Sequence, residues 1–144
     1  MLAEVPEFVA ILASTLFTGA AIYINLVEHP ARMRCGTEIA ATVWAPSYQR
    51  ATVMQVTLGI LSTVAGLTAW LLGLGLMWLV GALLIFCVIP FTVIAVMPTN
   101  KQLLNPELDH KSEATGILLQ KWARLHAVRS LLGLVASIIF ILSR

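Results

Sequence analysis

The sequence is poor in charge. Only 11% of its residues are Asp, Glu, Lys or Arg, whereas a soluble domain typically has about 25%, and 59% are hydrophobic. This excludes an ordinary soluble domain, because so much apolar surface has no favourable environment other than lipid. There is also no basic run interleaved with aromatic residues, so nucleic acid is not an expected partner.

Cysteine is scarce too. Cys35 and Cys87 are too few for a disulfide framework. We interpret Cys87 as a small apolar residue inside a membrane helix and Cys35, in a polar stretch, as a free thiol. The sequence contains no nucleophile elbow, phosphate-binding loop or paired-cysteine redox motif, so nothing in it supports those classes of enzyme.

What the sequence does contain is long apolar runs. Four of them have close to the roughly 20 residues that a helix needs to cross the hydrocarbon layer. We therefore predict an all-α integral membrane protein, a four-helix bundle of up-down topology that forms one domain over residues 1–144. The expected helices span about 6–28, 50–72, 76–97 and 122–143. The short turn at 73–75 makes the second and third helices antiparallel neighbours, and Pro90 predicts a kink in the third.

Two polar stretches, 31–49 and 101–120, connect these helices on one side of the membrane. The first is predicted to be a loop with a short surface helix, in which Pro46 begins the second crossing. The second is expected to hold a short soluble helix capped by Asn105, with His110 in solvent. Because basic residues favour the cytoplasm, we place both loops there and both termini outside, in the inner (cytoplasmic) membrane. The basic residues are Arg32, Arg34, Arg50, Lys101, Lys111, Lys121 and Arg124, against Arg144 on the opposite side.

Small residues mark one face of the second helix. They recur every seven residues and permit close approach of another helix, either inside the bundle or in a homodimer. Gly133 and Ser137 suit close packing on the fourth helix in the same way. The residues of the stripe are Thr52, Gly59, Gly66 and Gly73.

Polar side chains gather at the loop end of all four helices. Gln55, His126 and Arg129 lie inside apolar runs, where a polar group needs a partner, and an arginine at the bilayer centre costs about 2.5–3.5 kcal/mol on insertion scales. The cluster either lines a pocket open to the cytoplasm or only fixes the packing of the helices. Its members are Asn25, Glu28, His29, Arg50, Gln55, Thr99, Asn100, Trp122, His126 and Arg129.

The histidines of this cluster are candidate metal ligands. Two histidines, His29 and His126, with the carboxylate of Glu28 suit iron, zinc or copper. Neither an HxxxH nor an ExxH spacing occurs within one helix. A metal ion, a haem held by the two histidines and no cofactor at all are therefore open alternatives.

Four segments resemble a known family. They are Tyr23–Arg32 (YINLVEHPAR), Trp44–Gln55 (WAPSYQRATVMQ), Met97–Lys101 (MPTNK) and Trp122–Arg129 (WARLHAVR), and they are similar to the signatures of the anthrone-oxygenase-like group of small four-helix membrane proteins. Fungal members of that group oxidise anthrones to anthraquinones. The resemblance implies a monooxygenase that acts on a lipophilic phenolic or polycyclic substrate with dioxygen, either without a cofactor or with a single iron or copper ion.

The resemblance also suggests roles for the polar cluster. His126 or His29 is the expected base, Arg129 and Asn100 are expected to stabilise an oxyanion, and Trp122 to stack on the substrate. The remaining expected substrate contacts are Asn25, Gln55, Glu28 and Arg50. Three other functions compete with this one: a non-catalytic binding or scaffold protein, a haem-binding electron carrier, and a small multidrug transporter. Against the transporter, Glu28 stands at the end of its helix rather than deep inside it.

Overall fold

The computed structural model describes residues 4–144, and this part of the chain is helical without any strand. Four continuous helical rods within it, at 4–34, 37–71, 76–103 and 113–142, are long and apolar enough to cross a membrane. This confirms the predicted all-α membrane bundle. The rods are composed of α1 (Glu4–Tyr23), η1 (Ile24–Glu28) and α2 (His29–Arg34); α3 (Thr37–Leu71); α4 (Leu76–Phe91), η2 (Thr92–Val96) and α5 (Met97–Leu103); and α6 (Glu113–Leu142).

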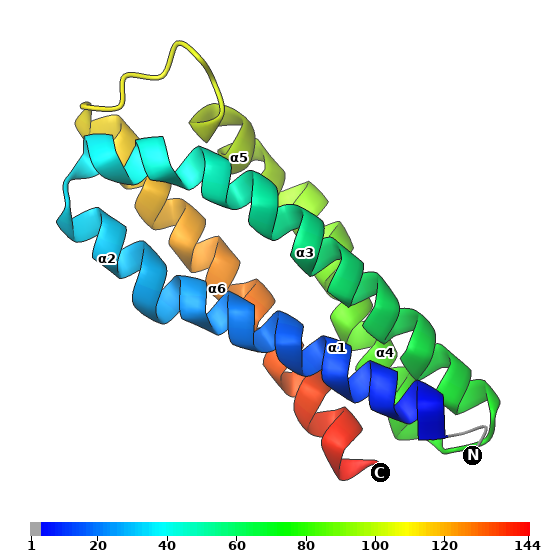
Figure 1. The fold of residues 1–144 in the computed structure, drawn as a ribbon. Coiled ribbons are helices and arrows are strands. Elements are labelled where there is room, and N and C mark those ends of the chain that lie inside the picture. The colour runs from blue at the N-terminus through cyan, green and yellow to red at the C-terminus, as the bar shows by residue number, and fades with distance from the viewer. Residues whose placement is uncertain (1–3) are drawn as a thin grey trace.

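Consecutive rods pack side by side. The α1 helix packs on α3 and α6, and α4 packs on the same two helices from the other side. The start of α1 and the end of α6 lie at one end of the bundle, and the connections at 35–36 and 104–112 lie at the other (Figure 1). We call these two ends of the bundle the terminal half and the loop half. The turn between α3 and α4 uses Gly73 and Gly75, whose φ angles are +85° and +112° and therefore favour glycine.

The second crossing helix begins earlier than the sequence suggested. The α3 helix starts at Thr37, so residues 37–49 form its first turns instead of a surface loop, and Pro46 lies inside the helix instead of beginning it. A proline inside a helix costs about 3 kcal/mol. Here Ala40, Ala41 and Trp44 are buried against the rest of the bundle, and this burial holds the helix together through Pro46.

The fourth crossing helix also begins earlier, at Glu113 instead of 122. Ser112 caps it, because its Oγ accepts a hydrogen bond from the backbone N–H of Thr115 at 3.2 Å. The helix expected from Asn105 does not form. Asn105 Oδ1 instead accepts from the backbone N–H of Glu107 at 3.0 Å, a local turn that competes with helix formation.

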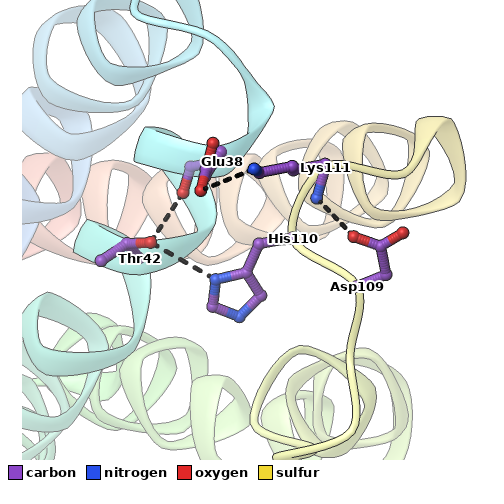
Figure 2. A network of polar contacts seen from close by, with 5 residues as sticks. All are labelled: Glu38, Thr42, Asp109, His110 and Lys111. Atoms are coloured by element: carbon purple, nitrogen blue, oxygen red, sulfur yellow. Dashed lines mark hydrogen bonds and ion pairs between the residues drawn. The ribbon is translucent and has the colours of Figure 1, made fainter.

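Polar contacts join the connection at 104–112 to the start of α3 (Figure 2). Thr42 donates its hydroxyl to the carbonyl of Glu38 at 2.7 Å, so the 3.3 Å contact from His110 Nδ1 to Thr42 Oγ1 has the imidazole as donor. Lys111 Nζ lies 3.7 Å from Glu38 Oε1. His110 is therefore half-buried and hydrogen-bonded, whereas the sequence had suggested a solvated side chain.

Two short π-helical turns, η1 and η2, interrupt the first and third rods. Each ends two residues before a proline. The N–H of His29, the residue before Pro30, bonds to the carbonyl of Ile24, and the N–H of Met97, the residue before Pro98, bonds to that of Thr92. Proline lacks an N–H and clashes with the carbonyl four residues back, and the wider turn relieves both problems. The departure from α-helical geometry in the third rod thus lies at 92–96, while α4 continues through Pro90.

Glycines produce close packing in the terminal half. A Cβ added to Gly66 or Gly81 would lie 2.8 or 2.6 Å from the ring of Phe140, and one added to Gly133 would lie 2.8 Å from the ring of Phe17. The predicted packing role of Gly133 is therefore confirmed. The stripe on α3 is only partly a packing surface, because a Cβ on Gly59 would meet nothing within 4 Å.

Candidate functional site

The first structural feature of the site is a hydrogen-bonded group around Asn25. This residue lies in the η1 turn, and its Nδ2 donates to the backbone carbonyl of Ala123 in α6 at 2.9 Å. That bond fixes the orientation of the amide, so Oδ1 is the atom that faces His126 Nδ1 at 2.7 Å and accepts from Ser130 Oγ at 2.7 Å. His126 Nδ1 must therefore carry a proton, and in the neutral imidazole Nε2 presents a free lone pair. In the described part of the chain nothing hydrogen-bonds to that nitrogen.

Aromatic rings gather around Trp122, which lies beside this histidine. The Trp122 ring lies 4.8 Å from the ring of His126, 5.3 Å from that of His29 and 5.6 Å from that of Trp44, to which it is nearly perpendicular. Tyr48 stacks on Trp44 at 4.8 Å. The guanidinium of Arg32 lies 5.9 Å from the centre of the Trp122 ring as well. Trp122 is thus enclosed by other side chains of the protein, which limits its face as a stacking surface for a substrate.

Two further polar pairs come from opposite helices. Arg129 Nη2 donates to Gln55 Oε1 at 2.9 Å, and both side chains are buried. Asn100, in α5, donates from Nδ2 to the hydroxyl of Tyr48 at 3.1 Å. Because the Tyr48 oxygen accepts that bond, its own hydrogen is free to be donated elsewhere.

Two cavities meet at these pairs. The smaller one has a volume of about 10 Å³, and His126 and Arg32 are part of its wall. The larger one has a volume of about 140 Å³. Four residues line both cavities and form the boundary between them: Tyr48, Thr52, Gln55 and Arg129.

The larger cavity is mainly apolar. Its polar end is the boundary just described, and its rim includes the exposed Val56 of α3 and Val93 of η2, so it opens towards the lipid-facing surface between these two elements. Gly59 lies in its wall, which explains why a Cβ added to that glycine would meet nothing within 4 Å. The other wall residues are Phe17, Ile85, Val88, Ile89, Thr92 and Met97.

Not every residue proposed from the sequence lines a cavity. His29 is buried and lines neither, Arg50 is exposed, and Asn100 approaches the site only through Tyr48. Glu28 accepts from Ser47 Oγ at 2.7 Å and pairs with Arg32 at 3.4 Å, so its partner is neither Arg50 nor Arg129. Among residues 4–144 no three His, Cys, Asp or Glu side chains are grouped as a metal site would need, so Glu28 does not join the two histidines.

The structure adds residues that the sequence analysis had placed in a polar loop or on a packing stripe. Trp44, Tyr48 and Thr52 lie on the face of α3 that carries Gln55, at spacings i, i+4, i+8 and i+11. This helical period was visible in the sequence, but it is informative only when α3 is known to start at Thr37. Arg32 was assigned to a loop and is buried in the site.

Comparison with known proteins agrees with this architecture. Residues 44–139, well over half of the chain, match the anthrone oxygenase family. Anthrone oxygenase tpcL of Aspergillus fumigatus is 37% identical over 71 residues, which cover 46% of this chain and 44% of the fungal protein. The similar stretch therefore spans less than half of that relative, and no solved structure matches the chain. With its match across most of three membrane-crossing helices, the chain belongs to the anthrone oxygenase family.

Proposed function

We propose that this membrane protein is a monooxygenase that oxidises a lipophilic aromatic ketone or phenol of the anthrone type with dioxygen. Family membership and the similarity to the fungal anthrone oxygenase support the reaction class. The observation that carries the proposal is local: His126, with a fixed tautomer, lines the smaller cavity, and Arg129, whose contact is the neutral oxygen of Gln55, lines both that cavity and the larger apolar one.

The larger cavity supports an aromatic substrate that arrives from the bilayer. An enclosed apolar cavity of about 150 Å³ is large enough to bind benzene, and this one has about 140 Å³. It therefore has room for about one ring, and the rest of a polycyclic substrate would extend through the rim at Val56 and Val93 towards lipid. We assign the polar end at Arg129 and Gln55 to the ketone oxygen of the substrate.

His126 is our candidate for the general base. Asn25 holds its Nδ1–H, which leaves Nε2 to remove a proton from the methylene carbon opposite the ketone. His29 is the weaker candidate, because it lines neither cavity. We assign Asn25 a positioning role through His126, and Asn100 a positioning role through Tyr48.

Arg129, with Gln55 and Tyr48, is placed to stabilise the negative charge that the proton transfer creates. Both guanidinium and phenol donate hydrogen bonds to an enolate oxygen, and such donors contribute most in a site that excludes water. The enolate then reacts with dioxygen: one oxygen atom becomes the new carbonyl oxygen and the other leaves in water. The methylene carbon is thereby oxidised to a ketone with dioxygen as the only oxidant required. A bound iron or copper ion stays a prediction of the family resemblance, and elemental analysis of the purified protein measures it.

The direct test is turnover of an anthrone by the purified protein in detergent, followed as oxygen consumption and quinone absorbance. We expect His126→Ala to lower kcat by about 10²-fold or more, the usual contribution of a general base. Asn25→Leu is expected to lower kcat with a smaller change in KM, since it acts through His126. His110→Ala, a histidine outside both cavities, is the matched control.

Two results would contradict the proposal: no quinone from the wild-type protein, or full turnover by a folded His126→Ala variant. The second result would favour a scaffold role, in which the polar cluster serves packing alone.

We also propose that the loop half faces the cytoplasm of a cell with this protein in its cytoplasmic membrane. The excess of basic residues there supports this orientation. Cys35, exposed at that end, offers a test with a membrane-impermeant thiol reagent. Labelling in inverted membrane vesicles and protection in intact cells are expected, and the reverse result would overturn the orientation.

A further inference from the structure

Several residues that line the smaller cavity carry buried hydrogen-bond donors that have no partner. Of the buried nitrogen and oxygen atoms without a hydrogen-bond partner in the described chain, six belong to residues that line this cavity, and every one of the six is a nitrogen that can only donate. They are Arg32 Nε and Nη1, Trp44 Nε1, Gln55 Nε2, Trp122 Nε1 and Arg129 Nε.

The charge of the wall is positive as well. None of the described residues that line the cavity is an aspartate or a glutamate. Glu28 offsets Arg32 from outside the wall, at 3.4 Å. Arg129 is 6% exposed and has no ion-pair partner among residues 4–144, since its contact is the neutral oxygen of Gln55. A buried cation and a buried donor without a partner each lower the stability of the protein, unless a negatively charged hydrogen-bond acceptor binds to them.

The size of the cavity limits what that acceptor is. A volume of about 10 Å³ holds roughly one water-sized molecule. A carboxylate ligand, a phosphate or an aromatic ring does not fit into this space, and an ion of two or three atoms would have to extend towards the larger cavity, which Arg129 also lines.

From these three observations we propose that the smaller cavity binds one small monovalent anion, and that during turnover this anion is reduced dioxygen. The second part rests on the proposed function; the first does not. Donors from Arg32, Trp122 and Arg129 would hold the anion next to His126, at the boundary with the larger cavity. The site thus has two compartments, one for the aromatic ring and one for the oxygen species.

The chemistry balances in this arrangement. The enolate gives one electron to dioxygen, which forms a substrate radical and superoxide, and the cationic pocket favours this transfer because it stabilises the product anion. The radical and superoxide then combine to form the carbon–oxygen bond of a peroxide anion. This anion takes back the proton that His126 holds, and loss of water from the hydroperoxide leaves the ketone.

Azide, a small monovalent anion, is the probe for the resting protein without any aromatic substrate. Trp44 and Trp122 line the cavity, so binding is expected to change tryptophan fluorescence with saturation and to raise the thermal unfolding temperature. Sulfate, which is larger and divalent, is expected to produce neither change.

Three variants locate the binding site. Arg129→Gln is expected to weaken azide binding by about tenfold or more, because it removes a charge-assisted donor. Gln55→Glu keeps Arg129 but places a carboxylate against it, and is expected to abolish binding. Arg124→Gln removes the same charge from an exposed position on the same helix and is expected to leave binding unchanged.

The outcomes separate the two parts of the proposal. Absence of saturable azide binding, or equal weakening by Arg124→Gln, overturns the anion site whether or not the protein is an oxygenase. If azide binds and inhibits turnover in competition with dioxygen, the assignment to reduced dioxygen is supported. If it competes with the aromatic substrate instead, the pocket holds the enolate oxygen and that assignment is overturned. An azide site in a protein that oxidises no anthrone leaves the anion site standing and removes the proposed function.

Discussion

In the terminal half of the bundle, buried hydroxyls are satisfied by nearby groups. Ser62 donates to the carbonyl of Ala10 at 3.0 Å, and Thr18 pairs with Ser137 at 3.1 Å. By contrast, all the buried side-chain nitrogens and oxygens of the described chain that have no hydrogen-bond partner lie in the loop half. These atoms belong to His29, Arg32, Trp44, Gln55, Thr99, Asn100, Trp122 and Arg129.

This difference separates two uses of polar groups in one membrane protein. Polar residues that serve only to join helices are expected to resemble the terminal half, with short hydroxyl bonds and glycine contacts. Each unpaired buried group in the loop half costs about 1–3 kcal/mol. That cost argues against packing as the only role of the loop half, and it fits a preorganised site whose partners arrive as ligands.

The largest difference in stability is expected between two glycine-to-leucine substitutions, one against a packed ring of the terminal half and one in the wall of the larger cavity. Gly133→Leu places a side chain where a Cβ already lies 2.8 Å from Phe17, so we expect the unfolding free energy to fall by about 1–3 kcal/mol or more. Gly59→Leu points into the larger cavity and should instead leave stability unchanged or raise it by up to about 1 kcal/mol, because leucine is the better helix former. Thermal unfolding in detergent measures both.

The effects of these two variants on turnover should be the reverse of their effects on stability. Gly59→Leu is expected to block the substrate cavity and stop the reaction, while the folded fraction of Gly133→Leu retains its activity. Gly19→Leu is the matched control, since Gly19 is exposed and a Cβ there meets nothing within 4 Å. Equal destabilisation by the first two variants would remove the distinction between the two regions.

The sequence predicts the fold well because the thickness of the membrane fixes the length of each helix. Apolar runs of membrane-spanning length and a short Gly-Leu-Gly turn leave few topologies, and the four rods follow. The helix starts could not be predicted in the same way. Residues 37–49 and 113–121 contain polar side chains and, in the first case, Pro46, and only the burial of Trp44 and Leu119 in the assembled bundle shows that they are helical.

The sequence predicted those site residues that are polar but lie within an apolar run. Gln55, His126 and Arg129 are polar residues within apolar segments, and the structure brings all three to the cavities. Arg32 and Tyr48 lie in polar stretches, where a charge or a phenol is unremarkable, so no local signal distinguishes them. The bond from Asn25 to His126 joins residues 101 positions apart, and the η1 turn that directs Asn25 towards α6 follows from His29-Pro30 only in the folded protein.

A smaller contrast is expected from a pair of serines on α6. Ser137→Ala removes the partner of Thr18 in the terminal half, and Ser130→Ala removes a donor to Asn25 in the loop half. Hydrogen bonds between membrane helices contribute about 0.6 kcal/mol on average, so both should lower stability slightly and similarly. Only Ser130→Ala should slow turnover, by several-fold, because Asn25 orients His126. Equal turnover of the two variants would show that Asn25 needs no support from Ser130.

The smallest effect on stability and turnover is expected from Thr42→Val. This variant tests whether the surface of the loop half matters as its interior does. The substitution keeps the shape of the side chain but removes both the bond to Glu38 and the contact with His110 (Figure 2). Since Thr42 is exposed, the loss of stability should stay below about 0.5 kcal/mol. Amide exchange should accelerate at 104–112, while turnover and azide binding stay at the wild-type level. A fall in turnover would mean that the contacts of this connection influence the cavities through α3, and that the loop half functions as one coupled unit.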